Sequence, residues 1–270
     1  MGASTIDLPA FRRVGEFLHP APFTQSGWGP MLIGRYVAAL IASAAEPHGE
    51  ELHPARLTVD LFKPVPLGPT SMTCRVVRAG RRIRVIDVDV LVEGTHVARG
   101  TVVFLARGGD SPAEQWLPPR VRLPEPDSLV FSHPAGGPIP WDQRQVGTWG
   151  SLAGALDRAA WYRESGPFIE GEATTPFVQA ALCADLGSGV VNAHPTGLHF
   201  INADLTLTLA TLPRGPWMAM VPISRAVDGG VAVGTCDVYD ESGRLGQVSY
   251  IALVDPRNTV VGEITDRSGA

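Results

Sequence analysis

The segment GPTSMTCRVVRAGRRIRVIDVDVLVEGTHVARGTVVFL (residues 68–105) has an altered second copy, GPWMAMVPISRAVDGGVAVGTCDVYDESGRLGQVSYIALV (215–254). Each copy opens with Gly-Pro and carries Arg-Ala ten residues later, at Arg78 and Arg225. Each then reaches an Asp-Val pair, a turn containing Glu and Gly, and a final apolar run. An offset of about 147 residues relates the two copies throughout, so we interpret them as an internal duplication.

A predicted helix precedes each copy at nearly the same offset. Pro30 opens an apolar run that ends at Glu46, and Pro176 opens a second run that ends at Gly187 and Gly189. Proline in the first turn and glycine or proline just past the last turn are the usual punctuation of helices. Both runs are apolar nearly all round, which is typical of helices that are buried on every side.

Eight runs rich in Val, Ile, Thr and Leu, four after each helix, have the composition of strands separated by turns. They cover residues 56–62, 71–79, 83–92, 97–105, 198–210, 217–226, 231–239 and 245–254. A buried helix followed by four antiparallel strands, twice over, predicts an α+β fold in which each curved antiparallel sheet wraps around one long helix. Joining the sheets into one continuous sheet would protect an edge of each half. We expect an N-terminal domain over 1–106, a proline-rich linker over 107–147 and a C-terminal domain over 148–270.

Composition and charge narrow the class of protein. The 270-residue chain has a net charge of −5 and no basic field of domain size, so nucleic acid is not an expected partner. Its three cysteines, at positions 74, 183 and 236, lie far apart and form no metal-binding motif, which suggests a reducing compartment and no metal. The longest apolar stretch, 31–45, is too short to span a bilayer and contains Arg35. We therefore expect a soluble cytoplasmic protein, and whether it forms a homo-oligomer stays open.

Five segments together carry the likeness to a known family. They are RLTVDLFKPVPLGP (56–69), RAGRRIRVIDVDVLVEGTHVARGTVVFLA (78–106), WYRESGPFIEGE (161–172), ADLGSG (184–189) and INADLTLTL (201–209). In this order they resemble the double-hotdog acyl-CoA thioesterases, the family of bacterial acyl-CoA thioesterase II and its actinobacterial relatives. The resemblance implies a double hotdog fold and hydrolysis of fatty acyl-CoA thioesters without a cofactor. It also implies a water positioned for attack by an Asp, a strand Thr and a Gln.

Asp185 is the first candidate for the catalytic carboxylate. It lies on an apolar helix, near the helix C-terminus, where a negative charge is disfavoured. A buried and poorly placed carboxylate has a raised pKa, which suits a general base. The duplication places Ala39 at the matching position of the first half, so the fold itself does not need a carboxylate there. The alternative is an Asp that faces solvent at a frayed helix end.

Three polar residues alternate on the strand after that helix, namely Asn202, Asp204 and Thr206, and are therefore predicted to share one face of the sheet. If that face meets the helix, they can hydrogen-bond Asp185 or its water; otherwise they form a solvated polar stripe. Thr206 fits the hydroxyl position of the family best. The family's Gln falls on Ile251, so either another group such as Asn202 holds the water or hydrolysis is weak or lost.

Further candidate residues would bind parts of the substrate or support the catalytic carboxylate. Gly27 and Gly29 precede the first predicted helix, where backbone N–H groups can stabilise an oxyanion; the alternative is that they only cap the helix. His199, three residues before Asn202, is a candidate for a supporting role, with a structural role as the alternative. A basic cluster that either binds the phosphates of CoA or forms a solvated hairpin comprises Arg78, Arg81 and Arg82.

Other function classes lack their motifs. A hotdog hydratase would need a His five residues after Asp185, where the chain has Val190, and a serine hydrolase would need Gly-x-Ser-x-Gly. We therefore expect an enzyme that hydrolyses acyl-CoA thioesters with medium to long chains, since Leu, Val and Ile dominate both predicted helix–sheet interfaces. The alternative is a non-catalytic protein that binds acyl-CoA or acyl groups in the same tunnel.

Overall fold

The computed structural model describes residues 6–109, 113–131, 139–255 and 259–260. Within them, one antiparallel sheet contains twelve strands in the order β1-β2-β4-β5-β6-β3-β11-β14-β13-β12-β8-β7. The strands of the N-terminal half are β1 (Phe11–Val14), β2 (Phe17–Pro20), β3 (His53–Leu61), β4 (Thr70–Ala79), β5 (Ile83–Val92) and β6 (Thr95–Leu105). Those of the C-terminal half are β7 (Trp141–Gln145), β8 (Ala160–Glu164), β11 (Phe200–Leu209), β12 (Met218–Asp228), β13 (Val231–Asp240) and β14 (Gly243–Val254). A separate small hairpin consists of β9 (Ala193–His194) and β10 (Gly197–Leu198).

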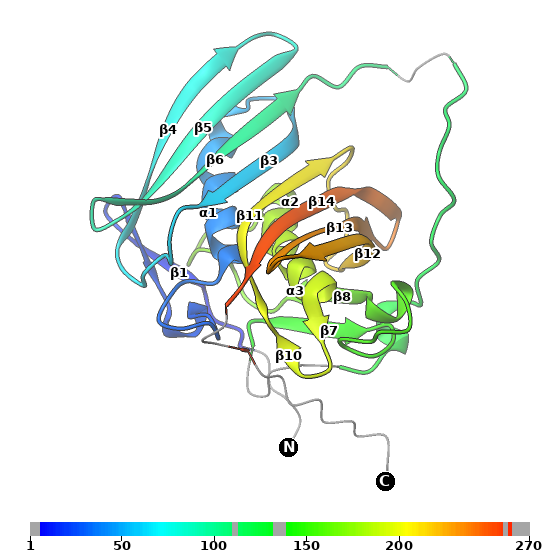
Figure 1. Ribbon diagram of the computed structural model, residues 1–270. Helices are drawn as coiled ribbons and strands as arrows, with labels where there is room; N and C mark the ends of the chain where they lie inside the picture. Colours follow the sequence, from blue (N-terminus) through cyan, green and yellow to red (C-terminus); the bar gives the residue numbers. More distant parts are fainter. Residues whose placement is uncertain (1–5, 110–112, 132–138, 256–258, 261–270) are drawn as a thin grey trace.

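The two halves join at the centre of the large sheet. There β3 pairs with β11, with Thr58 opposite Thr206. The prediction of one continuous antiparallel sheet is therefore confirmed, and all eight predicted strands coincide with observed strands to within a few residues. Figure 1 shows the N-terminal strands and the C-terminal strands side by side, with the helices on the inside of the sheet.

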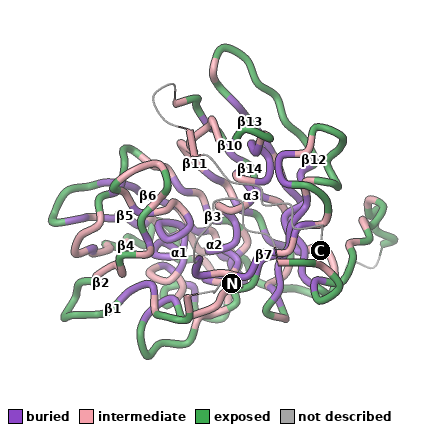
Figure 2. Tube along the Cα trace, turned by 90° about the horizontal axis from the view of Figure 1, so that it is seen from below, coloured by how far each residue is buried: buried purple, intermediate pink, exposed green. Residues whose placement is uncertain are grey.

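The α-helices of the described residues are α1 (Gly34–Ala45), α2 (Pro176–Ala184) and α3 (Leu186–Asn192). α1 and α2 pack against each other in opposite directions, since Thr175 at the start of α2 donates a hydrogen bond to Glu46 at the end of α1. Figure 2 shows the buried residues concentrated along the helices and the strands that surround them. None of the helices among the described residues is both long and apolar enough to cross a membrane.

The first helix begins four residues later than the sequence predicts, at Gly34 instead of Pro30. The residues just before Gly34 are held by other backbone bonds, because the Leu32 N–H donates to the Val65 carbonyl and the Ile33 N–H donates to the Thr24 carbonyl. These bonds fix an extended connection in place of a first helical turn. The predicted end of this helix, at Ala45 before Glu46, is confirmed.

The second helix does not end at Gly187 or Gly189 as predicted. It breaks at Asp185 and continues as α3 to Asn192. Gly187 serves a different purpose, because any Cβ at this position would collide with the Tyr250 hydroxyl. The glycine therefore permits the close approach of β14 to the broken helix, and the C-terminal half has two short helices where one long helix was expected.

The sheet also contains strands that the sequence did not predict, among them β7, which lies inside the predicted linker 107–147. Earlier linker residues pack as well: Val121 and Leu123 contact an apolar cluster on the outer face that includes Trp161 and Trp217. Figure 1 shows the chain after β6 swinging away from the sheet before it returns to the C-terminal half. The linker is therefore partly a cover for the outer face of β8 and β12.

A buried ion pair links the two halves. Arg35 in α1 pairs with Glu164 at the end of β8, and its Nε donates to the Leu182 carbonyl oxygen at 3.1 Å. The fully buried guanidinium also lies over the Trp141 ring, 4.6 Å from the ring centre. Burial raises the pKa of Glu164, and the Arg35 charge opposes this rise. Because a buried charge is costly without its partner, the pair fixes how α1 docks against the C-terminal half.

Candidate active site

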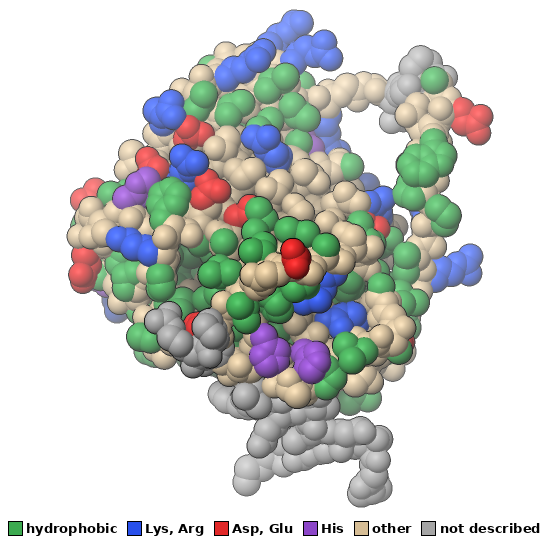
Figure 3. All heavy atoms as spheres, in the orientation of Figure 1, with side chains coloured by type: hydrophobic (Ala, Val, Ile, Leu, Met, Phe, Trp, Pro, Cys, Tyr) green, Lys and Arg blue, Asp and Glu red, His purple; other side chains and the backbone are tan. Residues whose placement is uncertain are grey.

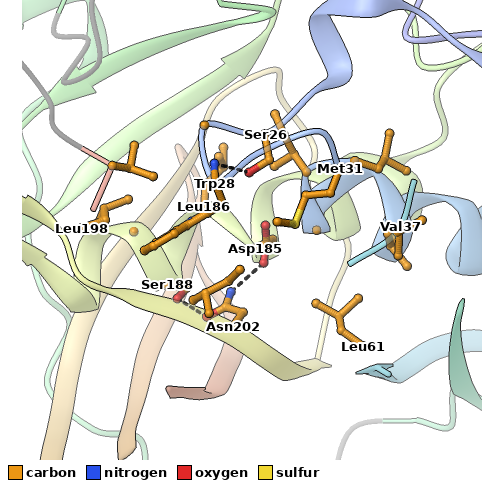
Figure 4. Close-up of a pocket in the computed structure, with 18 of the residues that line it drawn as sticks. Ser26, Trp28, Met31, Val37, Leu61, Asp185, Leu186, Ser188, Leu198 and Asn202 are labelled. Atoms are coloured by element: carbon orange, nitrogen blue, oxygen red, sulfur yellow. Dashed lines mark hydrogen bonds between the residues drawn. The ribbon is translucent and has the colours of Figure 1, made fainter. Parts of the chain in front are cut away.

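A large cavity lies where the start of α1, the break between α2 and α3, and the beginning of β11 come together (Figure 4). Its volume is about 950 Å³, which is large enough for a drug-sized ligand. Aromatic side chains from both halves form much of its wall: Phe23, Trp28, Phe62, Trp141, Trp149, Tyr162 and Phe200. Polar and charged side chains also line it: Gln25, Ser26, Lys63, Gln143, Asp185, Ser188, Asn202 and Asp255.

Asp185 lies where the second helix breaks, as the cap of α2 and of α3. At this break the Ala184 carbonyl oxygen accepts a hydrogen bond from the Tyr250 hydroxyl. Insertion of a side chain into the helical ladder is a known cause of such kinks. The Asp185 side chain reaches α1, where a Cβ built on Gly34 would lie 3.0 Å from both carboxylate oxygens. The carboxylate thus meets the N-terminus of α1, where a negative charge is favoured.

The pKa of Asp185 is raised, as the sequence predicted. Burial is the largest cause, because apolar surroundings disfavour the charged form. The hydrogen bond from Asn202, the charge of Arg35 and the backbone N–H of Arg35 oppose the rise without cancelling it. A carboxylate with a raised pKa is a stronger base toward a bound water.

A chain of hydrogen bonds holds the Asp185 carboxylate. Arg225 Nε donates to Asn192 Oδ1 at 3.2 Å, and Asn192 Nδ2 donates to Ser188 Oγ at 3.3 Å. The Ser188 hydroxyl donates to Asn202 Oδ1, and Asn202 Nδ2 donates to Asp185 Oδ1 at 2.7 Å, as Figure 4 shows. A guanidinium only donates and a carboxylate only accepts, so the direction of every bond in the chain is fixed. The chain therefore turns the N–H of Asn202 toward Asp185.

A β-bulge separates Asn202 from the polar residues that follow it. The pairing of β11 with β14 shifts register between Asn202 and Asp204, which interrupts the alternation of side chains. Asn202 contacts Asp185, whereas Asp204 and Thr206 line a different, outer cavity, and Asp204 Oδ1 accepts the Ile251 N–H at 2.8 Å. The prediction that the three residues share one face is therefore wrong. The structure does not bring Asp204 or Thr206 to Asp185.

The position that matches the family's Gln also faces outward. Ile251 is 47% exposed, while its neighbours Tyr250 and Ala252 are buried. The Tyr250 hydroxyl is already used on Ala184. The last strand therefore supplies no amide to the cavity in this stretch.

The predicted oxyanion and supporting residues do not have the surroundings that the sequence predicted. Gly27 lines the cavity, but neither Gly27 nor Gly29 stands at a helix N-terminus, because α1 begins at Gly34. The expectation of a helix N-terminus beside these two glycines is therefore wrong. His199 is not among the described residues that line the cavity, and its Nε2 is hydrogen-bonded to Thr196 Oγ1 at 2.9 Å.

The basic cluster lies at the far end of the N-terminal half. Arg81 and Arg82 form the turn between β4 and β5, and Arg78 lies near the end of β4. The cavity instead meets residues 61–65, just before β4 begins. A strand rises about 3.3 Å per residue, so the 10 residues of β4 separate the two ends by roughly 30 Å. Figure 3 shows basic side chains gathered over this hairpin tip. The structure does not bring the cluster to the cavity.

Neither the buried thiols nor a metal site provides a second candidate reaction centre among the described residues. Burial raises the pKa of the Cys183 and Cys236 thiols, so neither is poised as a thiolate nucleophile. No group of three or more His, Cys, Asp or Glu side chains among the described residues could hold a metal ion. Two carboxylates of the described chain line the cavity, those of Asp185 and Asp255, and Asp185 is the one that lies at the N-terminus of α1.

Sequence reasoning missed several residues of the site. Ser188 and Asn192 lie four positions apart on α3, so they share one face of it. Such a polar pair inside an apolar helix is the signal that could have revealed them. Gln143 also lines the cavity, and its signal is the alternation in WDQRQ (141–145), which puts Gln on the inner face of a strand. No sequence signal marks Gly34, because it lies inside the predicted helix.

Comparisons with known proteins point to one family. The family model of the acyl-CoA thioesterase N-terminal domain matches residues 24–105, and that of the C-terminal domain matches residues 112–249. No curated protein sequence gives a significant match. The two family models follow each other along the chain, one over each half.

Solved structures share the fold at low sequence identity. A proposed thioesterase from Novosphingobium aromaticivorans superposes with a TM-score of 0.69 at 21% identity, over 92% of this chain and 98% of its own. A hotdog-fold protein of unknown function from Alicyclobacillus acidocaldarius gives 0.67 at 19% identity, over 91% and 96%. Acyl-CoA thioesterase II from Mycobacterium marinum gives 0.61 at 16% identity, over 83% and 91%. These likenesses concern the fold, and with the family models they confirm the predicted double hotdog.

Proposed function

Because the chain belongs to the acyl-CoA thioesterase family, we propose that it hydrolyses acyl-CoA thioesters to the free acid and CoA. One observation carries this proposal. The Asp185 carboxylate has a raised pKa, lines a large cavity and lies against the N-terminus of α1. Thioester hydrolysis needs a base for water and donors for an oxyanion, and this arrangement supports both.

In the proposed reaction, a water oxygen attacks the thioester carbonyl carbon while Asp185 accepts a proton from that water. The carbonyl oxygen becomes an oxyanion, which backbone N–H groups at the start of α1 stabilise, with Gly34 as the first candidate. The tetrahedral intermediate then collapses, the C–S bond breaks and CoA leaves as a thiolate with the electron pair. A thiolate is a good leaving group, so the proton on Asp185 can return to it after the bond has broken.

The cavity supports acyl groups of medium to long chain. Its wall is mainly apolar, with aliphatic side chains such as Leu61, Val37 and Leu186 beside the aromatic ones (Figure 4). Burial of each methylene contributes about 0.8 kcal/mol, so a longer chain gains affinity until the cavity is full. The outer end of the cavity would then hold the pantetheine part of CoA.

A non-catalytic acyl-CoA-binding protein is the second candidate. It is favoured by the stretch of β14 that would carry the family's Gln. Ile251 faces outward, and neither of its buried neighbours, Tyr250 and Ala252, carries an amide. Without that group, water is held less firmly and the cavity retains only its binding role.

Two measurements on the same protein separate these candidates. Thiol release is followed across acyl-CoA chain lengths, and binding of the same series is followed by calorimetry. We expect saturable binding together with thiol release well above background. Tight binding without thiol release at any chain length would decide for the binding protein.

A further inference from the structure

One buried polar group of the cavity wall has no hydrogen-bond partner within the part of the chain that the structure describes. Gln143 on β7 is 2% exposed and lines the cavity. Its Nε2 has no hydrogen-bond partner among the described residues. A buried donor without a partner has lost its hydrogen bonds to water and has gained none within the protein, which is unfavourable. Nearly all such groups in folded proteins are paired, so the partner of this one is to be sought in a ligand.

The neighbours of Gln143 fix which way its amide faces. Trp141 Nε1 donates to Gln143 Oε1 at 3.4 Å. An indole N–H can only donate, so the amide oxygen must face Trp141 and the NH₂ group must face away from it. Trp141 is itself held under the Arg35 guanidinium. The free N–H is therefore presented by a preorganised pair of side chains.

Gln143 and Asn202, the residue that holds Asp185, belong to different parts of the sheet that meet at one cavity. β7 is an edge strand of the sheet, whereas β11, which carries Asn202, lies at the centre of the sheet. The sheet curls around α2 and α3, so residues of both strands line the same space. Directly opposite Gln143 lies Tyr162, which lines the cavity too. Burial raises the pKa of Tyr162, so this end of the cavity offers neutral polar groups.

We propose that the acyl group taken by this cavity carries a neutral oxygen, a hydroxyl or a keto group, that accepts a hydrogen bond from Gln143 Nε2. The inference rests on the proposed function, which puts the thioester at Asp185 and the acyl chain along the cavity. A plain saturated chain would cover the Gln143 N–H and leave it unpaired. A carboxylate does not suit this end, because the charge of Arg35 is already paired with Glu164.

The test compares binding of unreactive substrate analogues. In the carba analogues of acyl-CoA a methylene replaces the thioester sulfur, so the carbonyl is kept and hydrolysis is prevented. A hydroxyl is moved along an acyl chain of one medium length, and each compound is compared with the plain chain by calorimetry. For one hydroxyl position we expect about tenfold tighter binding than for the plain chain, which corresponds to about 1.4 kcal/mol.

Variants of Gln143 then show whether its amide is responsible. In Gln143→Leu and in the near-isosteric Gln143→Met, we expect the tenfold preference to vanish and the plain chain to bind at least as tightly as before. Gln145→Leu is the matched control, because Gln145 lies two residues on and donates to the Arg158 and Ala159 carbonyls instead. This control is expected to lower thermal stability while the preference remains.

Three outcomes would overturn the proposal. The first is that no hydroxylated analogue binds tighter than the plain chain, and the second is that the preference survives in both Gln143 variants. The third is an equal loss of affinity for plain and hydroxylated chains, which would put the amide on the carbonyl next to CoA. Failure of the proposed hydrolysis is seen separately, as an absence of thiol release, and leaves this binding result unchanged.

Discussion

The antiparallel pair of α1 and α2 has two ends, and the duplication makes these ends equivalent in outline. At one end the start of α1 meets Asp185 beside a cavity of about 950 Å³. At the other end the start of α2 meets Glu46, beside a cavity of about 330 Å³. Both ends place a carboxylate next to a helix N-terminus. Only the first end leaves room for a substrate of acyl-CoA size.

The second carboxylate, that of Glu46, has a structural role. Thr175 Oγ1 donates to Glu46 Oε2 at 2.7 Å and accepts the Val178 N–H at 3.2 Å, so it caps α2 and ties it to the end of α1. The burial that raises the pKa of Glu46 is offset in part by this bond. Asp185 is held instead by an amide, at a break that α1 does not have. A carboxylate at a helix N-terminus thus becomes a candidate site only with a break and space beside it.

Exchange of each carboxylate for its amide tests this comparison most strongly. Asp185→Asn should lower turnover of the preferred acyl-CoA by roughly two to four decades, the usual contribution of a general base, while ligand binding is retained. The matched variant Glu46→Gln should stay within about twofold of the parent protein. Thiol release measures both, and similar losses in the two variants would contradict the assignment.

Removal of the buried charge at the Asp185 end should have the next largest effect, on stability. Arg35→Met leaves Glu164 without its partner and is expected to cost about 3 kcal/mol of unfolding free energy. The double variant Arg35→Met/Glu164→Leu should recover most of that loss, because two apolar side chains replace the pair. Urea unfolding of the three proteins checks this, and an undiminished loss in the double variant would contradict it.

The series of hydrogen bonds that orients Asn202 can be interrupted without a change to the Asp185 carboxylate itself. In Ser188→Ala the Asn202 amide loses the donor that fixes it, so its N–H supports the charged form of Asp185 less. Because that hydrogen bond lowers the pKa of Asp185, its weakening raises the pKa further. The acidic limb of the rate profile should move to higher pH, and the plateau rate should fall by up to about tenfold.

The control for this pH shift is Thr206, which lies on β11 as Asn202 does. Thr206→Val changes the outer face of β11, so its acidic limb should coincide with that of the parent protein. A limb that is unmoved in Ser188→Ala would show that the orientation of Asn202 does not reach Asp185.

The smallest effect is expected where the likeness to the family placed a missing Gln. Ile251 lies on the outer face, so Ile251→Gln should change neither turnover nor affinity by more than about twofold, and stability by no more than about 0.5 kcal/mol. Steady-state kinetics is the measurement. A clear gain in turnover would mean that this side chain reaches the cavity.

Local patterns made the repeat and the eight strands predictable. The alternation of apolar residues in a strand, and the residues of the turns between strands, depend only on neighbouring positions in the sequence. The two features that build the site are not local. The break at Asp185 depends on the hydroxyl of Tyr250, and the turn of Asn202 away from the face of Thr206 depends on a shift in pairing with β14. Each is set by a strand that arrives more than forty residues later in the chain, so inspection of the helix or of β11 alone could not reveal it.

The pairing of β3 with β11 has a consequence for the order in which the molecule assembles. Several strands meet a neighbour across a short hairpin, but the paired residues of β3 and β11 lie 144 to 152 positions apart. The contact of Arg35 with Leu182 likewise joins residues 147 positions apart. Closure of long loops is slow, since its entropy cost is paid before the contacts form. We expect each half to gather its own strands first and the seam to close last. The cavity spans that seam, so recovery of thiol release after dilution from denaturant should lag behind recovery of the circular dichroism of the sheet.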